Sequence, residues 1–531
     1  MNTQNNILPE KENPPTKHQI SDKILTGIKD IINSLINTEE KFYGVEKSLR
    51  LKLFEIACLF LQLYLTALQD RFDYSANSEE YYKGDLVPRT LKTIFGEVRY
   101  WRTYYTRKKG GGGFYPFDAI TGLTSDGFSP LVMSLATKLA TRMSFAASVL
   151  VFKCFYDWAP SSEAIQGLVI GMGRDAALYM EQREAPENDG EVLVIEVDGK
   201  ATPTATSGEL EKRRGKRKKN TSCCNRHRNK DRRSRCHNGG KNKRKGDKRK
   251  NGRSITLVVM YTLKRGEDGK LHGPINKQVW GSYSPRKVML AWAKEQASKR
   301  GFPEDTKKRV HIVIDGEICL YDGLIKLFPN ATFALDIRHL EEKIWKVGRK
   351  FHKRGSKKLE AWASAKIEYL YTGKTAELIT ELKKLKLSLS ARANRDKVKR
   401  EKVSELISYI SIRPTMMKYK QLIEEDMVIA SGIVEGAARY VVGERMDCGG
   451  MRWIPERGEA LLKLRCIELN GDWDKFFDWG YQQWIEKMRG GEKVIIRSEI
   501  PEPLDTADSV DDYFLGCVFD YIENDEIQDA A

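Results

Sequence analysis

Apolar residues recur at helical spacing near the start of the chain. Hydrophobic positions three or four residues apart predict one helix within Ser21–Ile36 and another within Glu46–Asp70. β-branched and aromatic residues on either side of Gly96 predict a strand or hairpin over Leu91–Arg107. The Gly110–Gly113 run that follows predicts a flexible connection. The periodicity therefore changes from helix to strand before position 110.

A second helical pattern runs from Ser129 to Tyr179 and is broken at Ala159 and Pro160. Ser161 or Ser162 can cap the helix that follows the break. Two helices around a tight turn fit a helix-turn-helix whose second helix enters a DNA major groove. The same pattern fits an ordinary helical hairpin in a core, and both interpretations stay open.

Short apolar runs between positions 190 and 338 predict the strands of an α/β sheet. These runs are Glu191–Gly199, Ser254–Leu263, Asn276–Tyr283, Arg309–Gly316 and Ala331–Ile337. Helical patterns lie between several of them, as expected where at least one pair of strands is parallel. Residues 339–427 are rich in Lys, Glu, Leu and Ala, and they predict an all-helical insertion.

The positive charge of the chain is concentrated in one segment. Residues 211–253 hold 21 basic and three acidic side chains, which accounts for the whole net charge of +18. A block of this density repels itself, so we expect a disordered arm that binds the phosphates of DNA. Its DNA-binding residues are predicted to include Lys212, Arg213, Arg214, Lys216, Arg217, Lys218 and Lys219.

Cysteine spacing and the chain ends add further limits. Cys223, Cys224, His227, Cys236 and His237 lie in the basic arm, but their spacing fits no standard zinc finger, so we expect no zinc there. Nine scattered cysteines are typical of reduced thiols in a cytoplasm. We expect no signal peptide and no membrane span. Residues 496–531 are predicted to form an acidic tail.

Two apolar runs end in an acid followed by glycine, IEVDGK at Asp198 and IVIDGE at Asp315. An acid at the end of a buried strand is held rigidly at the edge of the sheet, and the glycine lets a ligand approach. Two such strands side by side would bring hard oxygen ligands together, as two-metal phosphoryl transfer requires. Asp-Gly is also ordinary turn chemistry, which remains the alternative for each pair.

A third acid is expected on a helix beside that sheet. In ASGIVEGAARYVVGER, Ser431 is a candidate N-cap and Glu435 lies in the first helical turns. Gly432, Gly436 and Ala437 would let this helix approach a sheet or a DNA backbone closely. A solvated helix face is the ordinary position of a glutamate, but the neighbours of Glu435 are small or apolar.

Several stretches resemble the ISKra-type transposases of bacterial insertion sequences, which are Asp-Asp-Glu (DDE) recombinases with an RNase H-like catalytic fold. The resemblance spans about Leu91–Trp479. It rests on GFYPFDAITGL, IEVDGK, IVIDGE, FPNATFALDIRHLEEKIW, SGIVEGAARYVVGERMDCGGMRW and LRCIELNGDWDKFFDW. The basic arm is longer than the family pattern, and CGGMRW replaces the usual Ser-Gly-Met-Arg-Trp. Neither difference removes a carboxylate.

The resemblance implies an activity and its residues. Asp198, Asp315 and Glu435 would be catalytic and would bind two Mg²⁺ or Mn²⁺ ions per active site. The enzyme would hydrolyse a phosphodiester at a transposon end, and the freed 3′-hydroxyl would then attack target DNA. Further DNA contacts are expected from Arg439, Arg445, Arg452 and Trp453. Trp453 and Trp473 fit equally well as core aromatics.

Asp336 and His339 follow the second acidic strand and are candidates for orienting the metal ligands, for contacting DNA or for no catalytic role. The partners implied are the terminal repeats and target DNA, both double-stranded, bound by a homodimer or higher oligomer on the bacterial nucleoid. The alternatives are an RNase H-like nuclease or resolvase without strand transfer, and a domesticated, non-catalytic DNA-binding protein. RNA binding through the basic arm would leave the two strand-end aspartates unexplained.

The expected organisation is an α/β protein with an RNase H-like core and an all-α insertion. A mainly helical N-terminal DNA-binding region precedes the core. The predicted parts are a disordered tail at 1–20, the N-terminal region at 21–185, the core at 190–338 and 428–485, the basic arm at 211–253, the insertion at 339–427 and the acidic tail at 496–531.

Overall fold

The computed structural model describes residues 13–71, 81–110, 112–209, 252–302, 308–390, 393–448 and 451–488. The predicted DNA-binding residues from Lys212 to Lys219, the Cys and His group at 223–237 and the acidic tail lie outside these ranges. The chain forms two compact units. One comprises Met1–Ser134, Phe152–Ala159 and Tyr481–Ala531, and the other comprises Leu135–Val151 and Pro160–Gly480.

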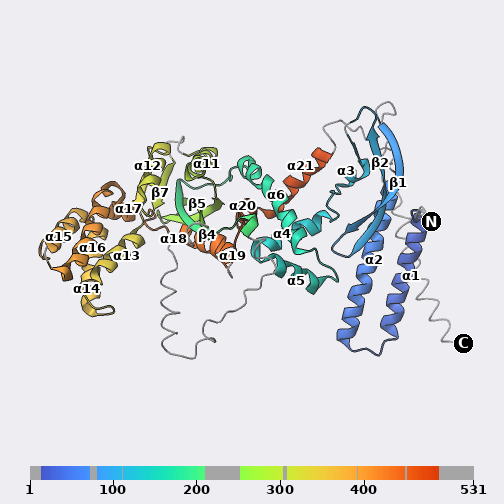
Figure 1. Ribbon diagram of the computed structural model, residues 1–531, viewed down its shortest axis with the longest axis horizontal. Helices are drawn as coiled ribbons and strands as arrows, with labels where there is room; N and C mark the ends of the chain where they lie inside the picture. Colours follow the sequence, from blue (N-terminus) through green and yellow to red (C-terminus); the bar gives the residue numbers. More distant parts are fainter. Residues whose placement is uncertain are drawn as a thin grey trace, which may run out of the picture. The chain divides into compact units, whose positions relative to one another are not determined.

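Two long helices open the first unit (Figure 1). α1 (Lys17–Ile36) and α2 (Phe42–Arg71) pack together through a cluster of buried isoleucines. Thr16 and Gln19 form a reciprocal capping box, so α1 begins at Lys17. The expectation of disorder as far as residue 20 is therefore wrong for the last residues of that range.

A three-stranded antiparallel sheet follows these helices. It comprises β1 (Tyr81–Lys92), β2 (Glu97–Arg107) and β3 (Gly113–Phe114), and α3 (Pro116–Thr121) comes next. The hairpin predicted around Gly96 is confirmed, and its first strand begins ten residues earlier than expected. Gly113 pairs with Thr106, so the end of the glycine run is part of the sheet and not a free connection.

The helix α2 also packs against β2, through a cluster that contains Leu65, Val98 and Tyr100. Within the described residues, Phe42–Gln69 of α2 is the one helical stretch long and apolar enough to cross a membrane, with mean hydropathy 1.7. A helix was predicted within this stretch, and no membrane span was expected there. Its buried residues Ile56 and Leu65 belong to the two hydrophobic clusters of this unit.

A buried charged cluster joins this sheet to α3. Asp118 is 6% exposed, and its carboxylate accepts hydrogen bonds from the Arg89 guanidinium and the Tyr100 hydroxyl, both at 2.8 Å. Arg102 forms a second ion pair with the same carboxylate. The buried negative charge is thus neutralised by two guanidinium groups.

The second unit is built on a five-stranded mixed sheet in the order β6-β5-β4-β7-β8. Its strands are β4 (Val192–Pro203), β5 (Gly252–Arg265), β6 (Leu271–Ser282), β7 (Arg309–Ile314) and β8 (Thr332–Leu335). β4, β5 and β6 pair antiparallel, whereas β4, β7 and β8 run parallel. All five predicted apolar runs are strands, and the α/β class with a parallel pair is confirmed.

Helices cover the sheet and extend the second unit (Figure 1). They include α4 (Pro130–Arg142), α5 (Phe145–Phe155), α6 (Ser162–Gln182), α11 (Arg286–Lys299), α12 (Ile318–Leu327), α20 (Pro455–Leu469) and α21 (Trp473–Met488). The ends of α4, α5 and α21 belong to the first unit. α11 packs on β5, and α20 packs on β6 and along α6.

The Ser161 hydroxyl caps α6 by accepting from the Ala164 amide at 3.0 Å, which confirms one of the two predicted caps. Ile165, Leu168 and Met172 of α6 are buried, and α6 packs along α20. The helix-turn-helix and the core hairpin both stay predictions. The division between the units does not coincide with the boundary expected near residue 185, because α6 packs along α20.

The described part of the predicted insertion contains helices joined by turns. It contains α13 (Ile337–Gly348), α14 (Lys357–Tyr371), α15 (Thr375–Leu387), α16 (Asn394–Ser411), the 3-10 turn η1 (Pro414–Met416) and α17 (Tyr419–Glu424). The Ile337 amide donates to the Ile429 carbonyl at 3.0 Å. The first and last residues of the insertion therefore lie next to each other beside the sheet.

Candidate active site

Asp198 lies in the middle of β4 and not at its end. The parallel pairing of β4 with β7 stops at Glu196 and Val313, but the antiparallel pairing with β5 continues to Pro203. The expectation that Asp198 is the last strand residue is therefore wrong, because β5 still supports β4 where β7 has ended. Asp198 projects just beyond the end of the parallel strand, as a site at this edge requires.

The glycine after Asp198 does not form a turn. Gly199 pairs with Thr256, and a β-carbon on Gly199 would lie 3.2 Å from a guanidinium nitrogen of Arg286. Its amide donates to the Asp198 carboxylate at 2.6 Å. Gly199 therefore serves close packing on an extended strand, and the turn interpretation of this Asp-Gly pair is wrong.

Asp315 occupies the position predicted for it, one residue after the end of β7. Gly316 has φ 85°, and a β-carbon there would meet Leu335 and the Tyr409 hydroxyl at 2.6 Å. Glycine is therefore required both by the backbone conformation and by the space available. The Asp315 carboxylate accepts from the Glu317 amide at 3.1 Å, and this short-range bond fixes its direction.

Glu435 is on α18 (Gly432–Ala437), which packs against β4 and β5. The helix continues through a π-helical segment, η2 (Ala438–Gly443), and ends in α19 (Glu444–Met446). Ser431 occupies the N-cap position, but its hydroxyl does not cap the helix. It donates instead to the Asp336 carboxylate at 2.5 Å. The predicted capping role is therefore wrong, and Ser431 joins the helix to the end of β8.

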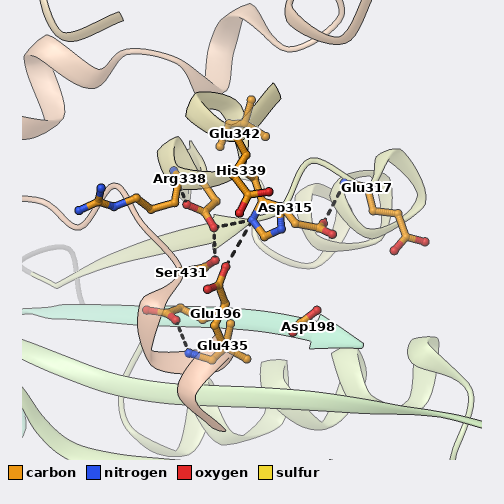
Figure 2. A network of polar contacts seen from close by, with 12 residues as sticks. Glu196, Asp198, Asp315, Glu317, Arg338, His339, Glu342, Ser431 and Glu435 are labelled. Atoms are coloured by element: carbon orange, nitrogen blue, oxygen red, sulfur yellow. Dashed lines mark hydrogen bonds and ion pairs between the residues drawn. The ribbon is translucent and has the colours of Figure 1, made fainter. Parts of the chain in front are cut away.

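Asp336 and His339 meet Glu435 at the start of α13. The Nδ1 atom of His339 lies 2.8 Å from Asp336 Oδ2 and 3.4 Å from Glu435 Oε1. Among the described residues, these three form the set whose potential ligand atoms all lie within 4.8 Å of one another. Asp198 and Asp315 are outside that set and lie beside it in Figure 2.

The charges of these side chains influence one another. Burial raises the pKa of Asp198, and the nearby Asp315 carboxylate raises it further. Burial and the Asp336 carboxylate likewise raise the pKa of Glu435. The hydrogen bond to Asp336 raises the pKa of His339. Within the described ranges, no Lys or Arg forms an ion pair with any carboxylate in this group.

Glu196 also belongs to this group, although it was not predicted from the sequence. It is 0% exposed, and burial raises its pKa to about 7. Its carboxylate accepts from the Val434 amide at 2.7 Å and from the Tyr261 hydroxyl at 2.8 Å. It therefore joins β4 to the first turn of the Glu435 helix (Figure 2). Its signal was a glutamate two residues before Asp198, on the same face of an apolar strand.

The four DNA-contact candidates near the Glu435 helix divide into two pairs. Arg439 and Arg452 are exposed and stay predicted DNA contacts. Arg445 is 2% exposed, its Nε donates to the Ala140 carbonyl at 2.8 Å, and it lies over the Trp453 ring.

Trp453 is itself 7% exposed and donates to the Met446 carbonyl at 2.9 Å, and Trp473 is 2% exposed. Arg445 and Trp453 are therefore core residues, and the expectation that they contact DNA from the surface is wrong. Trp453 and Trp473 both fit their predicted alternative as core aromatics.

The structure thus brings Asp198, Asp315 and Glu435 to one edge of the sheet, with Asp336, His339 and Glu196 around them. Oxygen-rich side chains of this kind, with no Lys or Arg partner among the described residues, suit a hard divalent cation. Comparison of the chain with protein-family models and with curated proteins found no match.

Proposed function

We propose that this chain is a DNA transposase that cleaves transposon ends and joins them to target DNA in a metal-dependent reaction. The observation that carries the proposal is the gathering of Asp198, Asp315 and Glu435 beside the end of β7, without a Lys or Arg partner among the described residues. Asp198 and Asp315 are half-buried and Glu435 is exposed. Hard oxygen ligands gathered at a solvent-accessible edge without such a partner are typical of a site that binds a divalent cation.

The strand order supports an RNase H-like core. Asp198 is on β4 and Asp315 directly follows the neighbouring strand β7 of a five-stranded mixed sheet, and Glu435 follows an all-helical insertion. This is the order of parts that the resemblance to ISKra-type transposases implies. The resemblance also supports DNA as the substrate and a homodimer or higher oligomer as the active form, since two ends must be held together.

The donor set fits Mg²⁺ or Mn²⁺, because the three proposed ligands offer carboxylate oxygens. When bound, the ions supply an activated water and neutralise charge on the scissile phosphate. Asp198 is held by the backbone pairing of β4 with β5, and Asp315 by the Gly316 turn. These rigid supports limit how far the two oxygen groups can move during reaction.

His339 has a positioning role in this proposal. Its Nδ1 lies between the carboxylates of Asp336 and Glu435, so it can hold Glu435 at the position observed. Ser431 and Glu196 fix the two sides of the same helix start. Their contacts orient Glu435 toward the sheet without requiring that any of these three side chains touch the substrate.

The test uses the purified full chain and a duplex that carries the inverted repeat flanking its coding region. Asp198→Ala, Asp315→Ala and Glu435→Ala should each reduce Mg²⁺-dependent cleavage by about 10³-fold or more, since each removes a metal ligand. DNA binding should remain. Cleavage that survives one of these substitutions would remove that residue from the site.

A second measurement separates the transposase from an RNase H-like nuclease or resolvase. A pre-cleaved end with a free 3′-hydroxyl should be joined to a second duplex, and Asp198→Ala should abolish the joining. Cleavage without joined products would support the nuclease. Binding without either reaction would support a non-catalytic DNA-binding protein.

A further inference from the structure

Basic residues of α13 form a row that begins at the candidate active site. His339, Lys343 and Lys346 follow one another on this helix at intervals of four and three residues, and Lys350 lies two residues beyond its end. Such spacing places side chains on one face of a helix. From His339 to Lys346 the row extends about 10 Å, at about 1.5 Å per helical residue.

This face borders a groove between α13 and α16, which pack together. The groove has a volume of about 470 Å³, and it is lined by Lys343, Lys346, Arg349, Lys350 and Lys402, with Glu405 as its acidic residue. Glu405 pairs with Lys402 at 2.5 Å, and Lys346 pairs with Glu342 at 2.9 Å. The basic residues still outnumber these two acids by three.

The groove adjoins the backbone of the site. Tyr409 of α16 lines the groove and donates its hydroxyl to the Asp315 carbonyl at 2.6 Å. Lys343 lies over the Tyr409 ring, with its Nζ 4.2 Å from the ring centroid. A chain of direct contacts therefore leads from the backbone of Asp315 through Tyr409 to the first lysine of the row.

We propose that this groove binds the phosphate backbone of one DNA strand on its way to the carboxylates. The proposal rests on the proposed function and adds the path of its substrate. Lysines act as point charges toward phosphates, and phosphate contacts carry no base sequence, so a row of them suits a backbone. The helical part of the row, about 10 Å long, corresponds to roughly three base-pair rises of a DNA strand.

The test compares two double variants of the full chain. Lys346→Ala with Lys350→Ala removes two charges from the groove. Lys383→Ala with Lys384→Ala removes two exposed charges from α15, outside the groove. Binding to a 30-base-pair DNA duplex is measured in EDTA across a range of salt concentrations, so that the result is independent of cleavage.

The groove variant should bind about tenfold more weakly near 0.1 M salt. The slope of log affinity against log salt should fall by about 2, since each phosphate contact contributes about 0.9. The α15 variant should match the unsubstituted chain. Equal losses in both variants, or none in either, would overturn the proposal. So would an RNA duplex of the same length that binds as tightly and suffers the same loss.

Cleavage distinguishes this proposal from the proposed function. The groove variant should raise the KM for DNA more than it lowers kcat, whereas Asp198→Ala should bind DNA and fail to cleave it. A chain that cleaves nothing but shows the predicted loss of binding would contradict only the proposed function. A chain that cleaves with an unchanged KM in the groove variant would contradict only the groove.

Discussion

Buried acids in the two units of this protein are stabilised in opposite ways. Asp118, beside the three-stranded sheet, has ion pairs with Arg89 and Arg102 and a hydrogen bond from Tyr100. Glu196, in the five-stranded sheet, accepts from backbone amides and from the Tyr261 hydroxyl, and it has no Lys or Arg partner among the described residues. The charge of the Asp118 carboxylate is neutralised by two cations, whereas the Glu196 carboxylate is stabilised by uncharged hydrogen-bond donors.

The difference extends to the neighbours of each acid. Around Asp118 the opposite charges are already present, so the cluster needs nothing more to be stable. Around Glu196 lie further acids, with His339 as the basic group that pairs with two of them. A sheet edge that gathers negative charge in this way lowers its own stability unless a cation binds. This contrast separates an acid that serves the fold from acids that serve a site.

The largest effect should come from breaking the compensated cluster. Asp118→Asn leaves two buried guanidinium groups without the negative charge that they pair with. It should lower the free energy of unfolding of the first unit by about 3 to 5 kcal/mol. Urea unfolding measures this loss. The matched substitution Asp198→Asn should change stability by less than about 1 kcal/mol, since it removes a charge that has no ion-pair partner among the described residues. A greater loss from Asp198→Asn would contradict the contrast.

Divalent cations should stabilise only the uncompensated group. At a concentration 100 times its dissociation constant, Mg²⁺ or Mn²⁺ should add about 3 kcal/mol to the stability of the second unit, and EDTA should reverse the effect. Thermal unfolding measures the shift. It should disappear in the double variant Asp198→Asn with Asp315→Asn and persist in Asp118→Asn. A shift of the same size in all three proteins would show that the cation binds elsewhere.

The smallest effect should come from removing one dipole from Glu196. Tyr261→Phe deletes the hydroxyl that donates to this carboxylate and should cost about 1 to 2 kcal/mol in urea unfolding. Tyr283→Phe is the control, because its hydroxyl contacts the neutral Thr202 hydroxyl at 2.7 Å. It should cost less and leave the response to Mg²⁺ unchanged. Equal losses of unfolding free energy in the two variants would mean that the hydrogen bond to Glu196 is no stronger than one between two uncharged groups.

The elements that could be predicted are those fixed by local patterns. Apolar runs predicted all five strands of the second unit, since a strand buried on both faces has few polar residues. The turn at Gly316 was also predictable, because the Asp-Gly pair that marks it is a signal between adjacent residues. The full length of β4 was not predictable, because it depends on pairing with β5 across a separation that no local pattern encodes.

The surroundings of the candidate site were harder to predict for the same reason. Ser431 looked like a cap from its neighbours, yet its partner Asp336 lies 95 residues earlier. Arg445 looked like a phosphate contact because arginine is usually exposed, and only tertiary packing places it in the core. Asp198, Asp315 and Glu435 could be proposed from the sequence, whereas Glu196 and the partners of these acids depend on the folded chain.

The two ends of the helical insertion meet beside the sheet, and this arrangement has a consequence for protein synthesis. A ribosome makes Asp198, Asp315 and Asp336 well before it makes Ser431 and Glu435. The bond between Ile337 and Ile429, and that between Ser431 and Asp336, can form only after the whole insertion has emerged. A nascent chain is therefore expected to lack a complete set of carboxylates until synthesis has passed Glu435, so translation itself delays the appearance of the site.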